Sequence, residues 1–124
     1  MIARTWRGAI RAKDSEAYLE YLGETGFKEY RATPGNRGVL GLRRRDGDRA
    51  EVLLITLWEN QEAIQRFAGD DMEAAVFYPE DERFLVDRDE RADHFEVIFN
   101  RLDGQPESPS WWKAIRPSSW VRLP

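Results

Sequence analysis

His94 is the side chain best suited to acid–base chemistry, because the chain contains one histidine and no cysteine. An imidazole is the one side chain whose unperturbed pKa lies near neutrality. A lone histidine excludes a multi-histidine metal cage, and the lack of cysteine excludes disulfides, thiolate zinc sites and a cysteine nucleophile. His94 is therefore the candidate proton acceptor, and a hydrogen-bonded structural histidine is the alternative.

Two clusters of charge resemble ion sites but have simpler interpretations. The basic run Arg43–Arg45 stands beside Asp46 and Asp48, which favours a solvated hairpin end over an anion site. The acidic run Glu80–Glu82 lacks the ligand spacing of an EF-hand and indicates a wet loop. The sequence therefore predicts no metal site.

The composition limits the classes of protein to which the chain could belong. A chain of 124 residues is expected to form a single core, and its net charge of −4 argues against nucleic acid as the main partner. The sequence contains no apolar run of about 18 residues, so we expect no membrane span. These features fit a bacterial cytoplasmic protein.

The element that must position this chemistry is a strand followed by a capped helix in the middle of the chain. Residues 52–57 are apolar or β-branched, as in a buried strand, and Trp58 closes it. Asn60 is a favourable helix cap, and Gly69 is a favourable stop. A second short helix is expected to begin near position 70.

The rest of the chain predicts an α+β fold with strand, helix, strand, strand, helix, strand order. This is the ferredoxin-like β-α-β-β-α-β unit, a four-stranded antiparallel sheet with helices on one face. Its other face needs cover, which a homodimer would provide by placing two sheets face to face as a dimeric α/β barrel. The further predicted elements are strands at 2–10, 38–45, 49–58 and 92–101, a first helix from Asp14 or Ser15 to about Gly26, a Pro-Gly turn at 34–35, a hairpin turn at 46–47 and a turn of helix at 80–84.

The composition changes after residue 102. The segment 103–124, DGQPESPSWWKAIRPSSWVRLP, has three tryptophans and no helical or strand period. We therefore expect a folded domain over 1–102 and a C-terminal arm over 103–124. Exposed tryptophans are a liability, so the arm is expected to pack on the body or on the partner subunit, as a dimer strap or as a pocket cap.

The stretch LITLWENQEAIQRFAGDDMEAAVFYPED, together with this element order, resembles the antibiotic biosynthesis monooxygenase family of dimeric α/β barrels. The similarity covers about 1–101. The family includes cofactor-free oxygenases of phenolic polyketide intermediates, quinol-oxidising relatives, haem-degrading enzymes and members without known activity. The fold alone therefore does not define the chemistry.

The resemblance allows the haem-degrading branch to be tested by residue. Its characteristic Asn, Trp and ligand His match Arg7, Phe67 and Phe77 in this chain, with Tyr78 close by. All three residues differ, which disfavours haem degradation by that mechanism.

The polyketide-oxygenase branch implies an activity without cofactor on an aromatic phenol or quinol, whose carbanion reduces oxygen itself. The protein would supply an apolar pocket, a proton acceptor and donors for the developing oxyanion. The catalytic candidates that this resemblance implies are His94, Arg7 and Asn60, and the substrate-binding candidates are Trp6, Asn36, Trp58, Phe67, Phe77 and Tyr78.

Several candidates also have a structural interpretation. Trp58 is expected in a core or interface, Asn60 as a helix cap, and Trp6 in barrel or dimer packing. The rival function is accordingly a non-catalytic binding protein or a structural homodimer of the same fold. A polar-lined cavity that holds His94 or Arg7 beside Trp58 would favour the enzyme, and a cavity filled by side chains would favour the rival.

Overall fold

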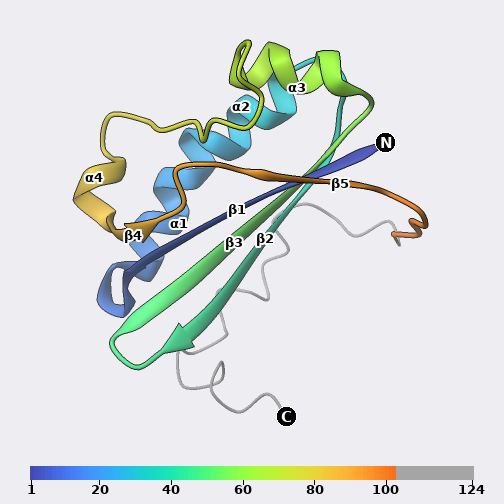
Figure 1. Ribbon diagram of the computed structural model, residues 1–124. Helices are drawn as coiled ribbons and strands as arrows, with labels where there is room; N and C mark the ends of the chain where they lie inside the picture. The colour runs from blue at the N-terminus through green and yellow to red at the C-terminus, as the bar shows by residue number, and fades with distance from the viewer. Residues whose placement is uncertain (103–124) are drawn as a thin grey trace.

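The computed structural model describes residues 1–102, so the predicted arm at 103–124 lies outside the described residues. One antiparallel sheet is covered on one face by helices (Figure 1). Its strands are β1 (Ile2–Arg11), β2 (Asn36–Asp46), β3 (Arg49–Trp58), β4 (Leu85–Arg88) and β5 (Asp93–Glu96). The helical elements are η1 (Ala12–Asp14), α1 (Ser15–Glu24), α2 (Gly26–Ala32), α3 (Gln61–Ala68) and α4 (Asp81–Phe84).

The strand order confirms the ferredoxin-like fold. The sheet runs β2-β3-β1, and the outer edge of β1 pairs with β4 and β5 in succession. Strand β4 pairs with Gly8–Ile10, and β5 pairs with Ile2–Thr5. The fourth strand of the fold is therefore divided into two short pieces. The predicted single strand over 92–101 was too long at its end, and β4 was not predicted.

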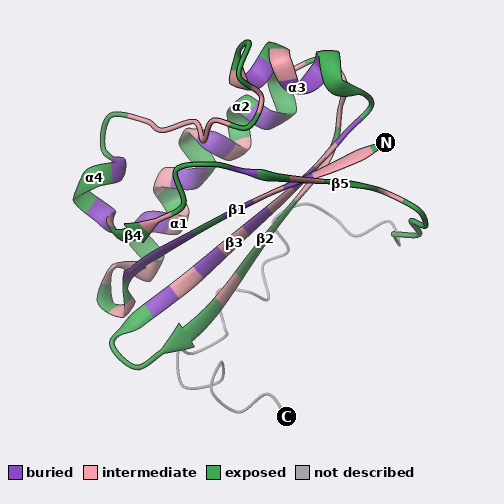
Figure 2. Ribbon diagram, in the orientation of Figure 1, coloured by how far each residue is buried: buried purple, intermediate pink, exposed green. Residues whose placement is uncertain are grey.

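Alternation along β3 separates the two faces of the sheet. Five alternate residues face the helices and are buried, whereas Leu53, Ile55 and Leu57 on the other face are half-buried, as the banding of β3 shows (Figure 2). A period of two with one buried face is expected for a sheet covered on one side. The buried series is Ala50, Val52, Leu54, Thr56 and Trp58.

The predicted local signals account for the turns around β3. Asp46 pairs with Arg49, and Gly47 adopts a φ of +63°, which glycine accepts without steric cost. The side-chain oxygen of Asn60 accepts a hydrogen bond from the Ala63 amide at 3.0 Å, so the predicted cap of α3 is confirmed. Helix α3 then ends at Gly69, as predicted.

One helical prediction was wrong, and one helix was not predicted. Helix α1 ends at Glu24, close to its predicted end near Gly26, but a second helix, α2, follows Thr25, whose φ and ψ of −116° and −93° are not helical. The short helix expected from position 70 does not form. The segment instead turns at positions 71–74, where the Ala74 amide donates to the Asp71 carbonyl. It then bonds to the stretch between β4 and β5, because the Ala75 amide donates to the Glu90 carbonyl and the Ala92 amide donates to the Glu73 carbonyl. These long-range bonds replace the expected helix.

Candidate functional site

Arg4 is a buried cation on the helix-covered face of the sheet. The residue is 3% exposed, and its Nη2 donates to the Ala74 carbonyl at 2.7 Å. The guanidinium carbon lies 5.5 Å from the centre of the Phe67 ring, within cation–π distance. Nε has no hydrogen-bond partner among the described residues. Burial lowers the pKa of Arg4, but a guanidinium remains charged in proteins.

His94 lies directly opposite Arg4 in the pairing of β5 with β1. Its Nε2 is buried and also lacks a hydrogen-bond partner within residues 1–102. Burial, and then the positive charge of Arg4, lower the pKa of His94 below its usual value. The imidazole is therefore neutral at pH 7 and can accept a proton.

Tyr78 completes a group that we call the Arg4 cluster, which consists of Arg4, His94 and Tyr78. The Tyr78 hydroxyl is buried without a partner in hydrogen-bonding geometry, although burial and the nearby Glu29 carboxylate raise its pKa. Arg4 interacts electrostatically with both other members. In the described part of the chain, these three residues supply the buried side-chain polar atoms that have no partner. Such atoms are costly to leave unpaired, so a water molecule or a ligand is needed as their partner.

An aromatic group flanks Arg4 on the side of α3. The Phe67 ring lies 5.6 Å from Trp58 and 4.7 Å from Tyr30, measured between ring centres. Trp58 is fully buried, and its indole nitrogen donates to the Thr56 hydroxyl at 2.7 Å. Burial raises the pKa of Tyr30 to about 12, so this phenol stays neutral. The space beside Trp58 is filled by these rings.

Trp6 lies on the same face as Arg4, two residues further along β1. Its indole nitrogen donates to the Asp89 carbonyl at 2.8 Å, and its ring meets Phe77 edge to face at 6.3 Å. The Arg88 guanidinium covers Phe77 at 4.2 Å. Five of the predicted substrate-binding residues therefore lie on the helix-covered face near Arg4. They are Trp6, Trp58, Phe67, Phe77 and Tyr78.

Three predicted site residues lie elsewhere. Arg7 is on the uncovered face, where its exposed side chain pairs with Glu51. Asn60 caps α3, and Asn36 donates to the Leu57 carbonyl at 3.3 Å where β2 bulges. The structure does not bring these residues together with His94. Arg4, which the sequence reasoning missed, carries the positive charge instead.

Two further properties bear on the class of the site. Within residues 1–102, no group of three or more His, Cys, Asp or Glu side chains is arranged to hold a metal ion. None of the helices in the same range is long and apolar enough to cross a membrane.

The comparisons relate this geometry to solved structures. No protein-family model and no curated protein matches the sequence. A Bacillus cereus protein provisionally designated an antibiotic biosynthesis monooxygenase is 14% identical, with a TM-score of 0.57 over 82% of this chain and 97% of that one. The haem-degrading protein MhuD of Mycobacterium tuberculosis, solved with two haems in its active site, is 17% identical, with a TM-score of 0.55 over 82% and 99% of the two chains. A Nitrosomonas europaea protein of unknown function is 13% identical, with a TM-score of 0.57 over 84% and 95%.

These identities show the fold alone. The chain has the fold of the antibiotic biosynthesis monooxygenase family, which confirms at that level the resemblance found in the sequence.

Proposed function

We propose, from this fold and the Arg4 cluster, that the protein is a cofactor-independent oxygenase of an aromatic phenol or quinol. The observation that carries the proposal is a buried arginine with an unpartnered Nε directly opposite a neutral histidine with an unpartnered Nε2. A phenol supplies both missing partners, because its oxygen can accept from Arg4 while its acidic proton passes to His94. The aromatic rings around Arg4 suit a flat apolar substrate.

The proposed reaction uses the reducing power of the substrate. For an anthrone, His94 Nε2 accepts a proton from the ring methylene, and Arg4 stabilises the negative charge that moves onto the oxygen. The carbanion then transfers electrons to dioxygen. The methylene becomes a carbonyl, and the second oxygen atom leaves as water, so that CH₂ and O₂ give C=O and H₂O. His94 returns its proton in the last step.

Haem is a poor fit to this site as it stands. Phe67 packs closely against Trp58 and Tyr30, and these rings fill the space beside Trp58 and leave little room for a large planar ligand. The residues matching the characteristic Asn, Trp and ligand His of the haem-degrading branch are Arg7, Phe67 and Phe77, and Arg7 lies on the opposite face. We therefore derive no haem chemistry for this chain.

The rival proposal is a non-catalytic binding or structural homodimer. The packed rings beside Trp58 favour it, since they leave little room at that end of the site. Under either proposal we expect two copies to cover each other through the uncovered face of the sheet. Leu40, Leu42 and Phe95 on that face are 42%, 45% and 57% exposed. Burying such apolar area drives association. A bacterial cytoplasmic setting remains a prediction.

Oxygen uptake with an anthrone such as dithranol tests the enzyme proposal. Metal-stripped protein should consume oxygen faster than a protein-free control, which is needed because anthrones autoxidise. Removing an oxyanion donor costs about 10²- to 10³-fold, so Arg4→Met should lower kcat/KM by about that factor. His94→Ala should lower it by about 10²-fold or more.

The Arg7→Met variant tests whether Arg4 or Arg7 is the oxyanion donor. The variant changes the same residue type on the same strand but on the opposite face, so we expect its uptake rate to match that of the unmodified protein. Equal losses in Arg4→Met and Arg7→Met would refute the assignment to Arg4. No uptake with several phenols and quinols would favour the rival, and a Soret shift on haem titration would contradict the steric argument.

A further inference from the structure

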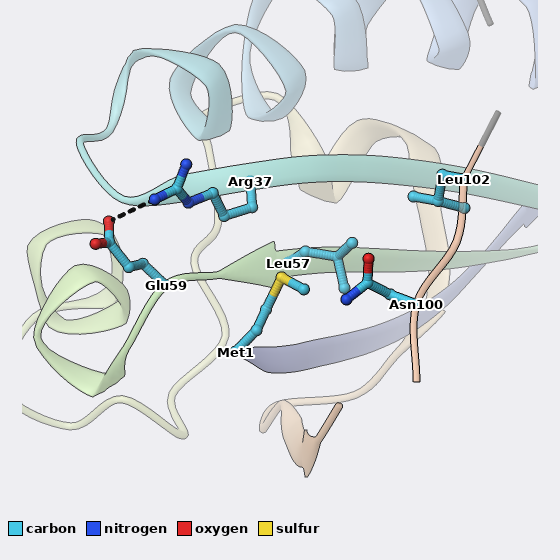
Figure 3. Close-up of a pocket in the computed structure, with 6 residues that line it drawn as sticks. All are labelled: Met1, Arg37, Leu57, Glu59, Asn100 and Leu102. Carbon is cyan, nitrogen blue, oxygen red and sulfur yellow. Dashed lines mark ion pairs between the residues drawn. The ribbon is translucent and has the colours of Figure 1, made fainter. Parts of the chain in front are cut away.

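A second site lies on the uncovered face, at the end of the sheet remote from the β2–β3 hairpin. A pocket of about 430 Å³ is lined there by Met1, Arg37, Leu57, Glu59, Asn100 and Leu102 (Figure 3). Its apolar side chains are Met1, just before β1, Leu57 of β3, and Leu102 at the end of the described chain. Arg37 and Glu59 form an ion pair of 3.4 Å at its edge. The Arg4 cluster occupies the other face of the sheet and does not contribute to it.

We infer that this pocket holds the segment 103–124 of the same protomer, anchored by Trp111 and Trp112. The described chain reaches the pocket through Leu102, which lines it and is itself 63% exposed. Trp111 follows nine residues later in the sequence, a separation that spans at most about 30 Å when extended. A loop this short returns to its starting point at a small entropic cost. The inference is independent of the proposed function.

The chemistry of the pocket matches tryptophan. An indole presents a large apolar surface with one N–H donor. Met1, Leu57 and Leu102 provide apolar contacts, while Asn100 and Glu59 provide acceptor oxygens at the edge. The volume lies within the roughly 300 to 1,000 Å³ typical of small-molecule pockets, so an indole fits.

The charges beside the tryptophan pair also match the charges at the edge of the pocket. Lys113 directly follows the tryptophan pair, and the acidic side chain of Glu59 stands at the pocket edge, 52% exposed. A basic residue beside an apolar anchor would therefore approach a half-exposed carboxylate and share it with Arg37, which already pairs with Glu59. Proline at 106, 109 and 117 prevents the segment from burying its own tryptophans in a continuous helix. The pocket offers them cover that the segment lacks.

Cysteine crosslinking in the full chain tests this inference, because the natural sequence has no cysteine to interfere. The pair Arg37→Cys and Lys113→Cys places one thiol at the pocket edge and one beside the anchor. The matched control pair, Lys28→Cys and Lys113→Cys, places the first thiol at an exposed position on α2, on the opposite side of the sheet. Both pairs react with a short bismaleimide, and a denaturing gel and peptide mass spectrometry identify the products.

The expected result is a link within one chain that forms at least tenfold faster in the Arg37 pair than in the Lys28 pair. Replacing Trp111 and Trp112 by serine in the Arg37 pair should reduce its rate to that of the control. Equal rates in the two pairs, or a rate that does not depend on the tryptophans, would overturn the inference. A link between two chains would also overturn it and would assign the pocket to a second copy.

Discussion

Replacing Arg4 by methionine should make the protein more stable while it abolishes ligand binding. A buried ion carries an effective desolvation penalty of several kcal/mol, and no carboxylate within residues 1–102 forms an ion pair with Arg4. Methionine retains the length and apolar contacts of the side chain without this penalty. It also loses the hydrogen bond to Ala74, worth about 1.5 to 3 kcal/mol, and the interaction with Phe67.

Replacing buried ionic groups by apolar residues of similar volume can stabilise a protein by about 1 to 4 kcal/mol. Because Arg4→Met also loses the hydrogen bond to Ala74, we expect the lower end, a gain of about 1 kcal/mol in the free energy of unfolding. For a domain of this size that corresponds to an increase of about 4 °C in Tm. Urea titration followed by tryptophan fluorescence measures the free energy, and thermal melting measures Tm. The same variant should lose phenol binding by at least tenfold in a titration.

Arg7→Met is the matched control for stability. Arg7 forms a solvent-exposed pair with Glu51, and its side chain is 58% exposed, so its loss should cost less than about 1 kcal/mol. If Arg4→Met instead destabilises the protein by more than about 2 kcal/mol, Arg4 is a structural residue. The argument that its charge is kept for a ligand would then fail.

Four further predictions concern separate parts of the structure. Since folding lowers the pKa of His94, its contribution to stability is complete above its usual 6.5 and is lost as the pH falls through the lowered pKa; His94→Gln should flatten this slope in urea titrations below pH 6.5. Burial raises the pKa of Asp81, so the contribution of Asp81 to stability is complete below its usual pKa of 3.8 and is lost as the pH rises through the raised pKa. The Asp81→Asn variant keeps an acceptor for the Tyr78 amide and should remove this fall of stability with rising pH. Asn60→Ala should cost about 1 kcal/mol in thermal melts, and a neutral result would refute the capping role. Leu42→Glu should shift the mass measured by light scattering from dimer to monomer, and an unchanged mass would contradict pairing through the uncovered face.

The elements that were predictable from the sequence are those fixed by local chemistry. The Asn60 cap, the Gly69 stop and the turn at Gly47 each depend on one residue and its immediate neighbours. The apolar run at 52–57 predicted strand β3, alternation predicted strand β1, and the order of elements predicted the sheet. Helix α2 and strand β4 could not be predicted in this way, since they depend on the break at Thr25 and on pairing with distant residues.

The candidate site was predicted only in part. His94 and the aromatic residues were identified by type, and Arg7, Asn36 and Asn60 were named as possible donors, whereas the cation of the proposed site is Arg4. The alternation of β1 separates the two arginines, because it places Arg4 with Trp6 on the buried face and Arg7 on the other. A charged residue on an apolar strand face is the signal that could have found Arg4. The role of Tyr78 depends on the path of the segment after Gly69, which no local pattern revealed.

The division of the outer strand also bears on how a ligand reaches a buried site. Strand β5, which carries His94, is four residues long and is separated from β4 by residues 89–92. Short edge elements open more readily than central strands, and amide hydrogen exchange reports such opening. We therefore expect the amides of β5 to exchange faster than those of β3, which is paired on both sides. Transient separation of β5 from β1 would expose Arg4 and His94 together without unfolding the rest of the sheet.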